Sequence, residues 1–403
     1  MDGIYALKNP VQEYAWGSKT AIADLLGDPA PSPVPQAELW MGAHPKAPSQ
    51  VSLPDGLITL DRFIAADPVG VLGAATAQRF ENRLPFLFKV LAAARPLSIQ
   101  AHPNLQQARE GFARENEAGI DIKASDRNYR DANHKPECIC ALTDFWALNG
   151  FRESRDMAAQ LTALCPRTLQ ELVAQTLPVN AAPDLRALLE TLLSLDADAC
   201  REIIDEAVTN LDARPSTDAV GRWVRALQEE YPYDIGVLSP AILNLVCLAP
   251  GQAMYLPAGQ LHAYLEGVGI ELMANSDNVL RGGLTPKHMD IPELMRVLNF
   301  STTALDVLVP ETVSSTEQVF RTNADEFELS VIAVAPEQPH ENEQRNAIQL
   351  LLCTQGRATV HRADDSAEMT VQKGSCLLIK AGTPAFQIVG SASLYKAAVP
   401  EKS

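Results

Sequence analysis

A block of amphipathic helical sequence interrupts a chain whose other segments are typical of β-strands. Four segments between residues 151 and 234 read MAAQLTALC, TLQELVAQTL, DLRALLETLLSL and ACREIIDEAVTNL, and their apolar residues recur every three or four positions. This spacing predicts amphipathic helices whose apolar faces pack together. A loop between Pro178 and Pro183 cuts the block. We therefore expect a compact helical insertion, so the chain would leave the β unit before residue 151 and return to it after residue 234.

The regions on both sides of this block predict strands. Short apolar runs separated by prolines and glycines fill residues 1–150 and 235–300, a pattern typical of β proteins. After residue 300 the runs FELSVIAVA, AIQLLLCTQG, ATVHRA and SCLLIKAG continue it. We expect a mainly β protein in which residues 1–150 and 235–300 form one β unit. Residues 151–234 would form a helical domain, and residues 301–403 a second β barrel or sandwich.

Composition excludes several classes of protein. The formal net charge of −17 argues against a nucleic-acid surface, which is normally basic, and requires a local cationic patch for any anionic substrate. No uncharged apolar stretch is long enough for a membrane span, and the N-terminal sequence lacks a secretory signal. Seven cysteines without a close-spaced framework are typical of free thiols in a reducing compartment. We expect a cytoplasmic protein that binds neither nucleic acid nor membrane.

The segment LSIQAHPN, residues 97–104, predicts a strand with one functional face. Side chains alternate along a strand, so Ser98, Gln100 and His102 point to one side and apolar side chains to the other. Pro103 cannot donate a ladder hydrogen bond and suits the end of a strand. A solvated polar face and a ligand site inside a barrel would both produce this pattern.

The segment GQAMYLPAGQLH, residues 251–262, resembles the second motif of the cupin barrels. Gly251 and Gly259 permit tight turns, and Pro257 restrains the backbone between them. His262 would then enter the next strand pointing into the barrel. Glu137, in NHKPECIC, could complete the ligand set with a carboxylate. One amide oxygen, one carboxylate and two imidazoles, from Gln100, Glu137, His102 and His262, suit zinc or another borderline divalent metal. We interpret Cys138 and Cys140 as buried structural thiols.

The C-terminal segment GSCLLIKAGTPA, residues 374–385, repeats the two glycines of this motif. Lys380 stands in place of the proline and Ala385 in place of the histidine. The repeat predicts a second cupin-like barrel without a metal ligand at that position, although two glycines also match by chance. The predicted fold class is therefore mainly β, with two cupin-like (jelly-roll) β barrels plus an α-helical domain.

The segment GIELMANSDNVLRGGLTPKH, residues 269–288, predicts a polar pocket wall. By alternation, Glu271 and Asp277 share a face. Arg281 precedes two glycines and Lys287 follows six residues later, and arginine suits phosphate or a developing negative charge. A surface hairpin with solvated charges would give the same residues. Lys89, within PFLFKVL, is either buried with a partner or at a sheet edge. We interpret four other histidines as ordinary surface or core residues: His44, His288, His340 and His361.

Taken together, these residues resemble the type I mannose-6-phosphate isomerases, also called phosphomannose isomerases. The likeness runs in order through YAWGS, ELWMGAHPKAPS, PFLFKVL, LSIQAHPN, HKPE, LPAGQLHAYLEG and ELMANSDNVLRGGLTPKH. The C-terminal third resembles the family's second barrel only in general character. The resemblance implies one Zn²⁺ per chain. Its ligands would be Gln100, His102, Glu137 and His262.

The resemblance also implies an aldose–ketose isomerase that interconverts mannose 6-phosphate and fructose 6-phosphate through an enediol. Arg281 would act in catalysis. The residues Ser98, Lys89 and Lys287 would meet the phosphate. The base that takes the C2 proton is open between Glu271, Lys135 and a water on the metal. We favour Glu271 for the face it shares with Asp277, and His134 could move protons between the sugar oxygens.

Three other functions are compatible with parts of this pattern. An iron-dependent cupin oxygenase would use the same ligands but gives no role to Arg281 or Lys287. A non-enzymatic sugar-phosphate binding module needs the cations and not the metal. An isomerase of free sugars would need no phosphate contacts. A monomer is expected, and the family implies a place in GDP-mannose biosynthesis.

Overall fold

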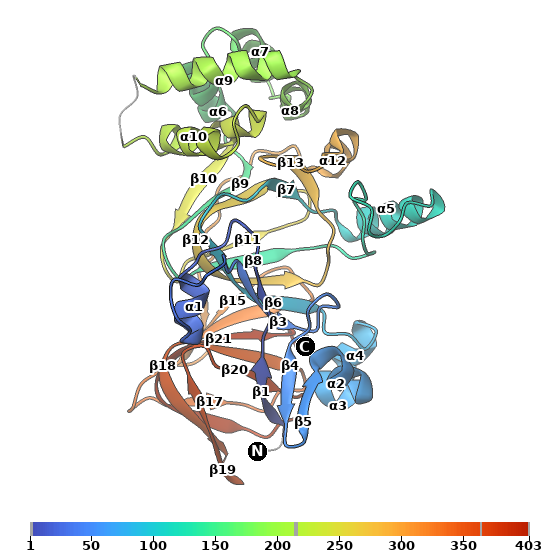
Figure 1. The fold of residues 1–403 in the computed structure, drawn as a ribbon, viewed down its shortest axis with the longest axis vertical. Helices are drawn as coiled ribbons and strands as arrows, with labels where there is room; N and C mark the ends of the chain where they lie inside the picture. Colours follow the sequence, from blue (N-terminus) through green and yellow to red (C-terminus); the bar gives the residue numbers. More distant parts are fainter. Residues whose placement is uncertain (1–2, 213–216, 363–364, 402–403) are drawn as a thin grey trace.

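The computed structural model describes residues 3–212, 217–362 and 365–401. These residues form two β-sheets and a group of helices along an elongated molecule. In Figure 1 the helices α6 to α10 lie at one end, the sheet that contains β12 lies in the middle, and the sheet that contains β18 lies at the other end. No helix of the described ranges is long and apolar enough to cross a membrane.

The middle sheet is organised by one long strand, β12. This strand pairs antiparallel with β6, β7, β8 and β9, so residues from four distant segments meet along it. The strands of this sheet are β2 (Val11–Gln12), β3 (Glu38–Gly42), β6 (Phe86–Ala93), β7 (Ile99–Ala101), β8 (Glu137–Ala141), β9 (Phe145–Phe151), β10 (Leu243–Leu248), β11 (Ala253–Leu256), β12 (His262–Ala274) and β13 (Leu280–Gly283).

The second sheet combines the C-terminal strands with three strands from the start of the chain. Strand β1 pairs with β20, and β4 then pairs with β1, so the N-terminal residues contribute to both sheets. The division of the chain into domains stays a prediction. The strands of this sheet are β1 (Ile4–Lys8), β4 (Gln50–Leu53), β5 (Gly56–Thr59), β14 (Glu311–Thr312), β15 (Glu317–Phe320), β16 (Glu328–Val334), β17 (His340–Asn342), β18 (Gln349–Arg362), β19 (Asp365–Gln372), β20 (Cys376–Ile379) and β21 (Phe386–Ala398).

The predicted helical block is confirmed. Its helices are α6 (Ser154–Leu164), α7 (Gln170–Thr176), α8 (Leu185–Leu193), α9 (Ala197–Leu211) and α10 (Ala219–Glu230). Aspartates 184, 196 and 218 cap α8, α9 and α10 by accepting backbone N–H bonds, which satisfies donors that a helix leaves free. The other helices are α1 (Ala21–Leu26), α2 (Leu60–Ala66), α3 (Pro68–Leu72), α4 (Ala74–Arg79), α5 (Leu105–Glu117), η1 (Ile235–Leu238), α11 (Ser239–Ile242) and α12 (Ile291–Val297).

Strands β6 and β12 separate an apolar core from a face that carries charged side chains. On one side, Phe88 and Leu272 belong to an apolar cluster with C-terminal residues that include Leu350, and each such buried side chain stabilises the fold by about 1.5–3 kcal/mol. On the other side, alternation presents Lys89 and Glu271. Within the described residues the strand pairings trace no closed barrel, so the mainly β class is confirmed at this coarser level.

Candidate active site

Three predicted metal ligands meet in the middle sheet. His102 follows β7, Glu137 begins β8 and His262 begins β12. Their ligand atoms all lie within 4.8 Å of one another. Both imidazole Nε2 atoms lie 3.4 Å from a Glu137 carboxylate oxygen. All three residues are buried, with at most 1% of their surface exposed, so the strand ends bring these ligands together away from bulk water.

The atoms that face one another in this cluster lack hydrogen-bond partners. His102 Nε2, His262 Nε2 and Glu137 Oε2 are buried and make no hydrogen bond. Leaving such groups unpaired costs on the order of 1–3 kcal/mol each. One cation coordinated by two imidazoles and a carboxylate would satisfy all three, and this donor set suits zinc. The residues therefore fit a bound divalent metal.

The other nitrogen of each imidazole is fixed by a backbone carbonyl. His102 Nδ1 lies 2.7 Å from the Asn278 carbonyl oxygen, and His262 Nδ1 lies 3.0 Å from that of Gln260. When Nδ1–H donates to these carbonyls, the Nε2 lone pair is left for a metal. Burial lowers the pKa of His102 to about 4, so this imidazole is neutral at neutral pH, as a metal ligand must be.

Lys135 lies beside the carboxylate of the cluster. Its Nζ is 3.1 Å from Glu137 Oε1. Although burial alone would raise the pKa of Glu137, the charge of Lys135 holds it well below its ordinary value. The carboxylate is therefore ionised and able to bind a cation. Cys138 and Cys140 are buried free thiols, as predicted, and burial raises the pKa of both.

Gln100 lies on the same face of the sheet as the cluster. In β7 it stands directly opposite His262 of β12 and opposite Arg281 of β13. Residues directly opposite in an antiparallel pair point to the same side. Sequence alternation thus placed Gln100 on the face of the metal ligands, and its role as a ligand stays a prediction.

A buried lysine joins two carboxylates on the adjoining strands. Trp40 of β3, Lys89 of β6 and Glu271 of β12 stand opposite one another in register. Lys89 Nζ lies 2.8 Å from Glu271 Oε2 and 3.5 Å from Glu38 Oε1. The indole N–H of Trp40 donates to Glu38 Oε2 at 2.7 Å. Of the two environments proposed for Lys89, the structure shows the buried, paired one.

The net effect of these contacts and of burial is a raised pKa for both Lys89 and Glu271, which favours the charged form of the lysine and the neutral form of the glutamate. Burial alone would lower the pKa of Lys89, but the carboxylates of Glu271 and Glu38 raise it above its ordinary value. Burial raises the pKa of Glu271, although Lys89 acts in the other direction. Glu271 is thus a carboxylate whose pKa is moved toward neutral pH, as a general base requires. Sequence reasoning missed Glu38 and Trp40, which alternation along ELWMG would have placed on one face.

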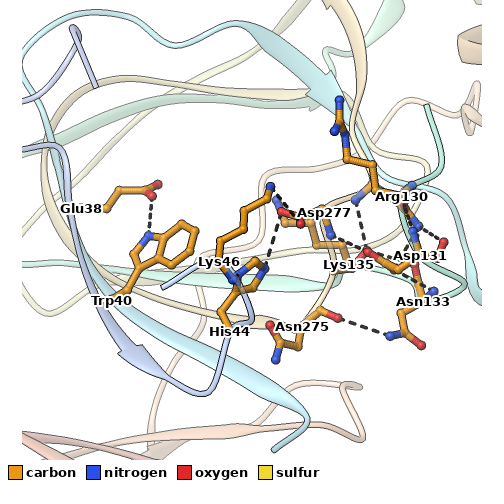
Figure 2. Close-up of polar contacts among 12 residues, drawn as sticks. Glu38, Trp40, His44, Lys46, Arg130, Asp131, Asn133, Lys135, Asn275 and Asp277 are labelled. Carbon is orange, nitrogen blue, oxygen red and sulfur yellow. Dashed lines mark hydrogen bonds and ion pairs between the residues drawn. The ribbon is translucent and has the colours of Figure 1, made fainter. Parts of the chain in front are cut away.

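Asp277 lies beyond the strand along which alternation links it to Glu271. Strand β12 ends at Ala274, so the alternation that links Asp277 to Glu271 stops before Asp277 is reached. Figure 2 shows its carboxylate facing His44 and Lys46, at 3.6 Å and 2.9 Å. Burial would raise the pKa of Asp277, but its bonds to these two residues lower it well below its ordinary value. His44 is buried, and its local sequence does not indicate the partner, Asp277.

The structure does not bring the imidazole of His134 to the metal ligands. His134 Nε2 lies 2.7 Å from Glu326 Oε1, in the segment between β15 and β16. The next residue, Lys135, instead points to Glu137, with its Nζ 3.1 Å from Glu137 Oε1. The geometry therefore favours Lys135 over His134 at the site.

Three residues that were predicted to contact an anion lie on or next to the strands β7 and β13. Arg281 is half-buried on β13, Ser98 is half-buried just before β7, and Lys287 is exposed beyond β13. Within the described ranges, neither Arg281 nor Lys287 forms an ion pair. Burial lowers the pKa of both, and Arg281 and Arg130 reinforce this shift at Lys287. Cations without a carboxylate partner are suited to an anionic ligand.

A mainly β fold with a buried His–Glu–His group defines a candidate metal protein, and comparisons with known proteins assign its family. A model of the phosphomannose isomerase type I catalytic domain matches residues 4–154. Mannose-6-phosphate isomerase of Escherichia coli is 41% identical over 390 residues, which are 96% of this chain and 97% of that protein. The mouse enzyme is 32% identical over 94% of this chain and 93% of its own. The chain belongs to the type I phosphomannose isomerase family.

Solved structures agree with this assignment. A zinc-bound mannose 6-phosphate isomerase superposes with a TM-score of 0.89 at 39% identity, covering 99% of this chain and 100% of that one. The enzyme from Salmonella typhimurium bound to substrate (f6p) and zinc gives a TM-score of 0.91 at 39% identity, with 99% and 100% coverage. The fold described above is therefore that of relatives whose structures contain zinc and a sugar phosphate.

Proposed function

We propose that this chain is a zinc-dependent aldose–ketose isomerase that interconverts mannose 6-phosphate and fructose 6-phosphate. The observation that carries the proposal is a cluster of three buried metal-ligand atoms without hydrogen-bond partners, one each from His102, Glu137 and His262. The family assignment and the zinc-bound and substrate-bound relatives support the same reaction. An iron oxygenase and a simple binding module share only parts of this combination.

His102, Glu137 and His262 would hold one Zn²⁺, with Gln100 as the fourth ligand from the same face of the sheet. When bound, zinc supplies a Lewis acid that polarises a carbonyl and stabilises developing negative charge. The protein's own contribution is to orient both imidazoles through their Nδ1–H bonds to carbonyl oxygens. Lys135 keeps the Glu137 carboxylate ionised.

Glu271 is our proposed general base. Its carboxylate would take the proton from C2 of the open-chain aldose and return one to C1, while the oxygen-bound proton moves from O2 to O1. Lys89 would orient the carboxylate through its 2.8 Å ion pair. Arg281, which has no carboxylate partner in the described residues, would stabilise the negative charge that develops on the sugar oxygen. Asp277 would hold the loop that carries His44 and Lys46.

Ser98 and Lys287, with Lys89 as a further predicted contact, would bind the substrate's phosphate. Ser98 lies two residues before Gln100, so a phosphate beside it would lie next to the metal ligands. The charge of Lys89 is already matched by two carboxylates, and this favours a role at Glu271. Lys287 is exposed at the approach to the site and lacks such partners.

The finer structural and cellular predictions belong to the same proposal. The matched glycine torsions of residues 251, 259, 374 and 382 support two cupin-like units, with residues 151–234 as the helical domain between two parts of the first unit and residues 301–403 as the second. The free thiols support the reducing cytoplasm as the compartment. A monomer and a place in GDP-mannose biosynthesis complete the proposal.

Conversion of mannose 6-phosphate to fructose 6-phosphate tests the proposed function. Purified protein should convert the substrate, lose activity on dialysis against a chelator and regain it with zinc. Folded, zinc-loaded protein that binds the sugar phosphate without converting it would instead establish a binding module. Oxygen consumption with iron and no isomerisation would favour the oxygenase.

A further inference from the structure

Arg130 is a third cation in the region of Arg281 and Lys287 that has no acidic partner. It lies between α5 and β8, and its charge acts on both of the other two residues. Among the described residues, no carboxylate forms an ion pair with any of the three. The chain carries a formal charge of −17, so an uncompensated group of cations is unusual on it. Like charges repel at short range, and a bound anion would relieve that repulsion.

The guanidinium of Arg130 is held in place without being neutralised. Its Nη1 donates to the Ile122 carbonyl at 3.4 Å and its Nη2 to the Ala124 carbonyl at 3.3 Å. Guanidinium has five N–H donors, so donors remain for a ligand. Figure 2 shows the side chain extending away from Asp131 and Asn133. The Asp131 carboxylate instead accepts from Ser276 Oγ and from the Asp277 backbone N–H.

Hydrogen bonds through Asn278 connect the backbone of Arg130 to the predicted metal ligand His102. Its N–H donates to Asn278 Oδ1 at 2.7 Å, and the Asn278 carbonyl accepts from His102 Nδ1 at 2.7 Å. Asn278 is fully buried. Arg281, three residues further along, stands opposite Gln100. Arg130 is thus fixed to the same short segment that orients His102 and presents Arg281.

We propose that Arg130 is a specificity-determining residue of this site: together with Lys287 it binds the phosphate dianion of the substrate, while the neighbouring Arg281 keeps its role at the reacting sugar oxygens. The inference rests on the proposed function for the identity of the substrate, and on the cation cluster for the binding of phosphate. Arg130 would contribute equally to substrate and transition state, so its loss should raise KM and leave kcat nearly unchanged. It would also help the enzyme to reject the unphosphorylated sugar.

Two variants separate charge from loop structure. Arg130→Gln keeps donors for the carbonyl oxygens and removes the charge, whereas Arg130→Lys keeps the charge and loses the planar fork. Arg201→Gln, on the exposed face of α9, is the matched control. Inorganic phosphate is the probe, measured by calorimetry on the zinc-loaded protein and as a competitive inhibitor of isomerisation. Zinc content and melting temperature report whether the fold is intact.

For Arg130→Gln we expect phosphate affinity to fall about 10- to 100-fold, the range of a charge-assisted hydrogen bond, with a similar rise in KM. The kcat value should change by less than about threefold, and zinc content should not change. Arg130→Lys should give an intermediate affinity and the control variant none of these effects. Phosphate affinity and KM within about twofold of wild type, or zinc lost together with phosphate binding, would overturn the inference. If the wild type binds phosphate through Arg130 but converts no sugar, only the proposed function fails.

Discussion

Two turns of this molecule share a backbone conformation and differ in chemistry. One leads from β11 into β12, and the other leads from β20 into β21. Gly259 lies in the first turn with a φ angle of 77°, and Gly382 lies in the second with a φ angle of 72°. Gly251 and Gly374, which lie two residues before the strands β11 and β20, have φ angles of 86° and 87°. Side chains other than glycine resist these angles. The two sequences therefore specify the same turn.

The residues around the turns decide where a metal can bind. His262 begins the strand after the first turn, whereas Ala385 directly precedes the strand after the second. Glu137 pairs with the last residue of β11, and Gln349 pairs with the last residue of β20. The C-terminal turn thus has the frame of the first without its imidazole or its carboxylate. The comparison shows that the shared backbone only provides positions for ligands, and that the side chains of His262 and Glu137 make one of the two turns a candidate metal site.

Removing the imidazole should make the first turn chemically equivalent to the second. We expect His262→Ala to fold, to bind no zinc and to lose at least about 1,000-fold in kcat/KM, because a metal supplies several kcal/mol of transition-state stabilisation and each 1.36 kcal/mol is tenfold in rate. Elemental analysis and the isomerase assay measure both effects. The control, Ala385→Ser, should change neither. A zinc-free His262→Ala variant with wild-type activity would exclude this site.

Two buried lysines, one in each sheet, sharpen the comparison. Lys89 pairs with Glu271 and Glu38, and Lys396 lies 2.6 Å from Glu317. Replacing either by methionine leaves a buried carboxylate unpaired, which we expect to lower the free energy of unfolding by about 3–5 kcal/mol. Urea unfolding measures this loss.

Only the first lysine is expected to affect chemistry. Lys89→Met should lose activity in the fraction that remains folded, whereas folded Lys396→Met should keep the wild-type kcat. Equal kcat values for the two variants would remove Lys89 from the active site.

Arg281→Ala should separate catalysis from metal binding. Because we assign Arg281 to developing charge, the variant should keep its zinc and lose about 100-fold in kcat. Steady-state kinetics and metal analysis are the measurements. A rise in KM alone, with kcat unchanged, would show that Arg281 only binds the phosphate.

The smallest expected effect concerns Asp277 and pH. Its pKa is lowered in the folded protein, so its ionised form stabilises the fold above its ordinary pKa of 3.8, and this contribution is lost as the pH falls through the lower folded value. Because the side chain of Lys46 is 57% exposed, we expect Asp277→Asn to cost only about 1 kcal/mol at pH 7. Urea unfolding should show the difference from wild type shrinking below pH 3.8. A difference that is constant with pH would contradict this.

Local rules account for what the sequence could predict. Strand alternation placed Gln100 and His102 on one face, and the positive-φ glycines placed His262 at the start of a strand, because both effects depend only on neighbouring residues. The amphipathic spacing predicted the helices between residues 151 and 234 for the same reason.

Contacts between distant segments could not be predicted in this way. The Asn278 carbonyl that orients His102 and the pairing of β1 with β20 join parts of the chain that no local pattern connects. Alternation could not place Asp277, because β12 ends at Ala274. The pairing of His44 with Asp277 joins residues that lie far apart in the sequence.

Zinc-edge anomalous diffraction from crystals of the purified protein tests the central claim most directly. We predict one peak per chain, about 2.0–2.2 Å from His102 Nε2, His262 Nε2 and a Glu137 carboxylate oxygen, and no peak at the turn that contains Gly382, between β20 and β21. A zinc peak at any other position, or an active crystalline protein without zinc between these three residues, would contradict the account.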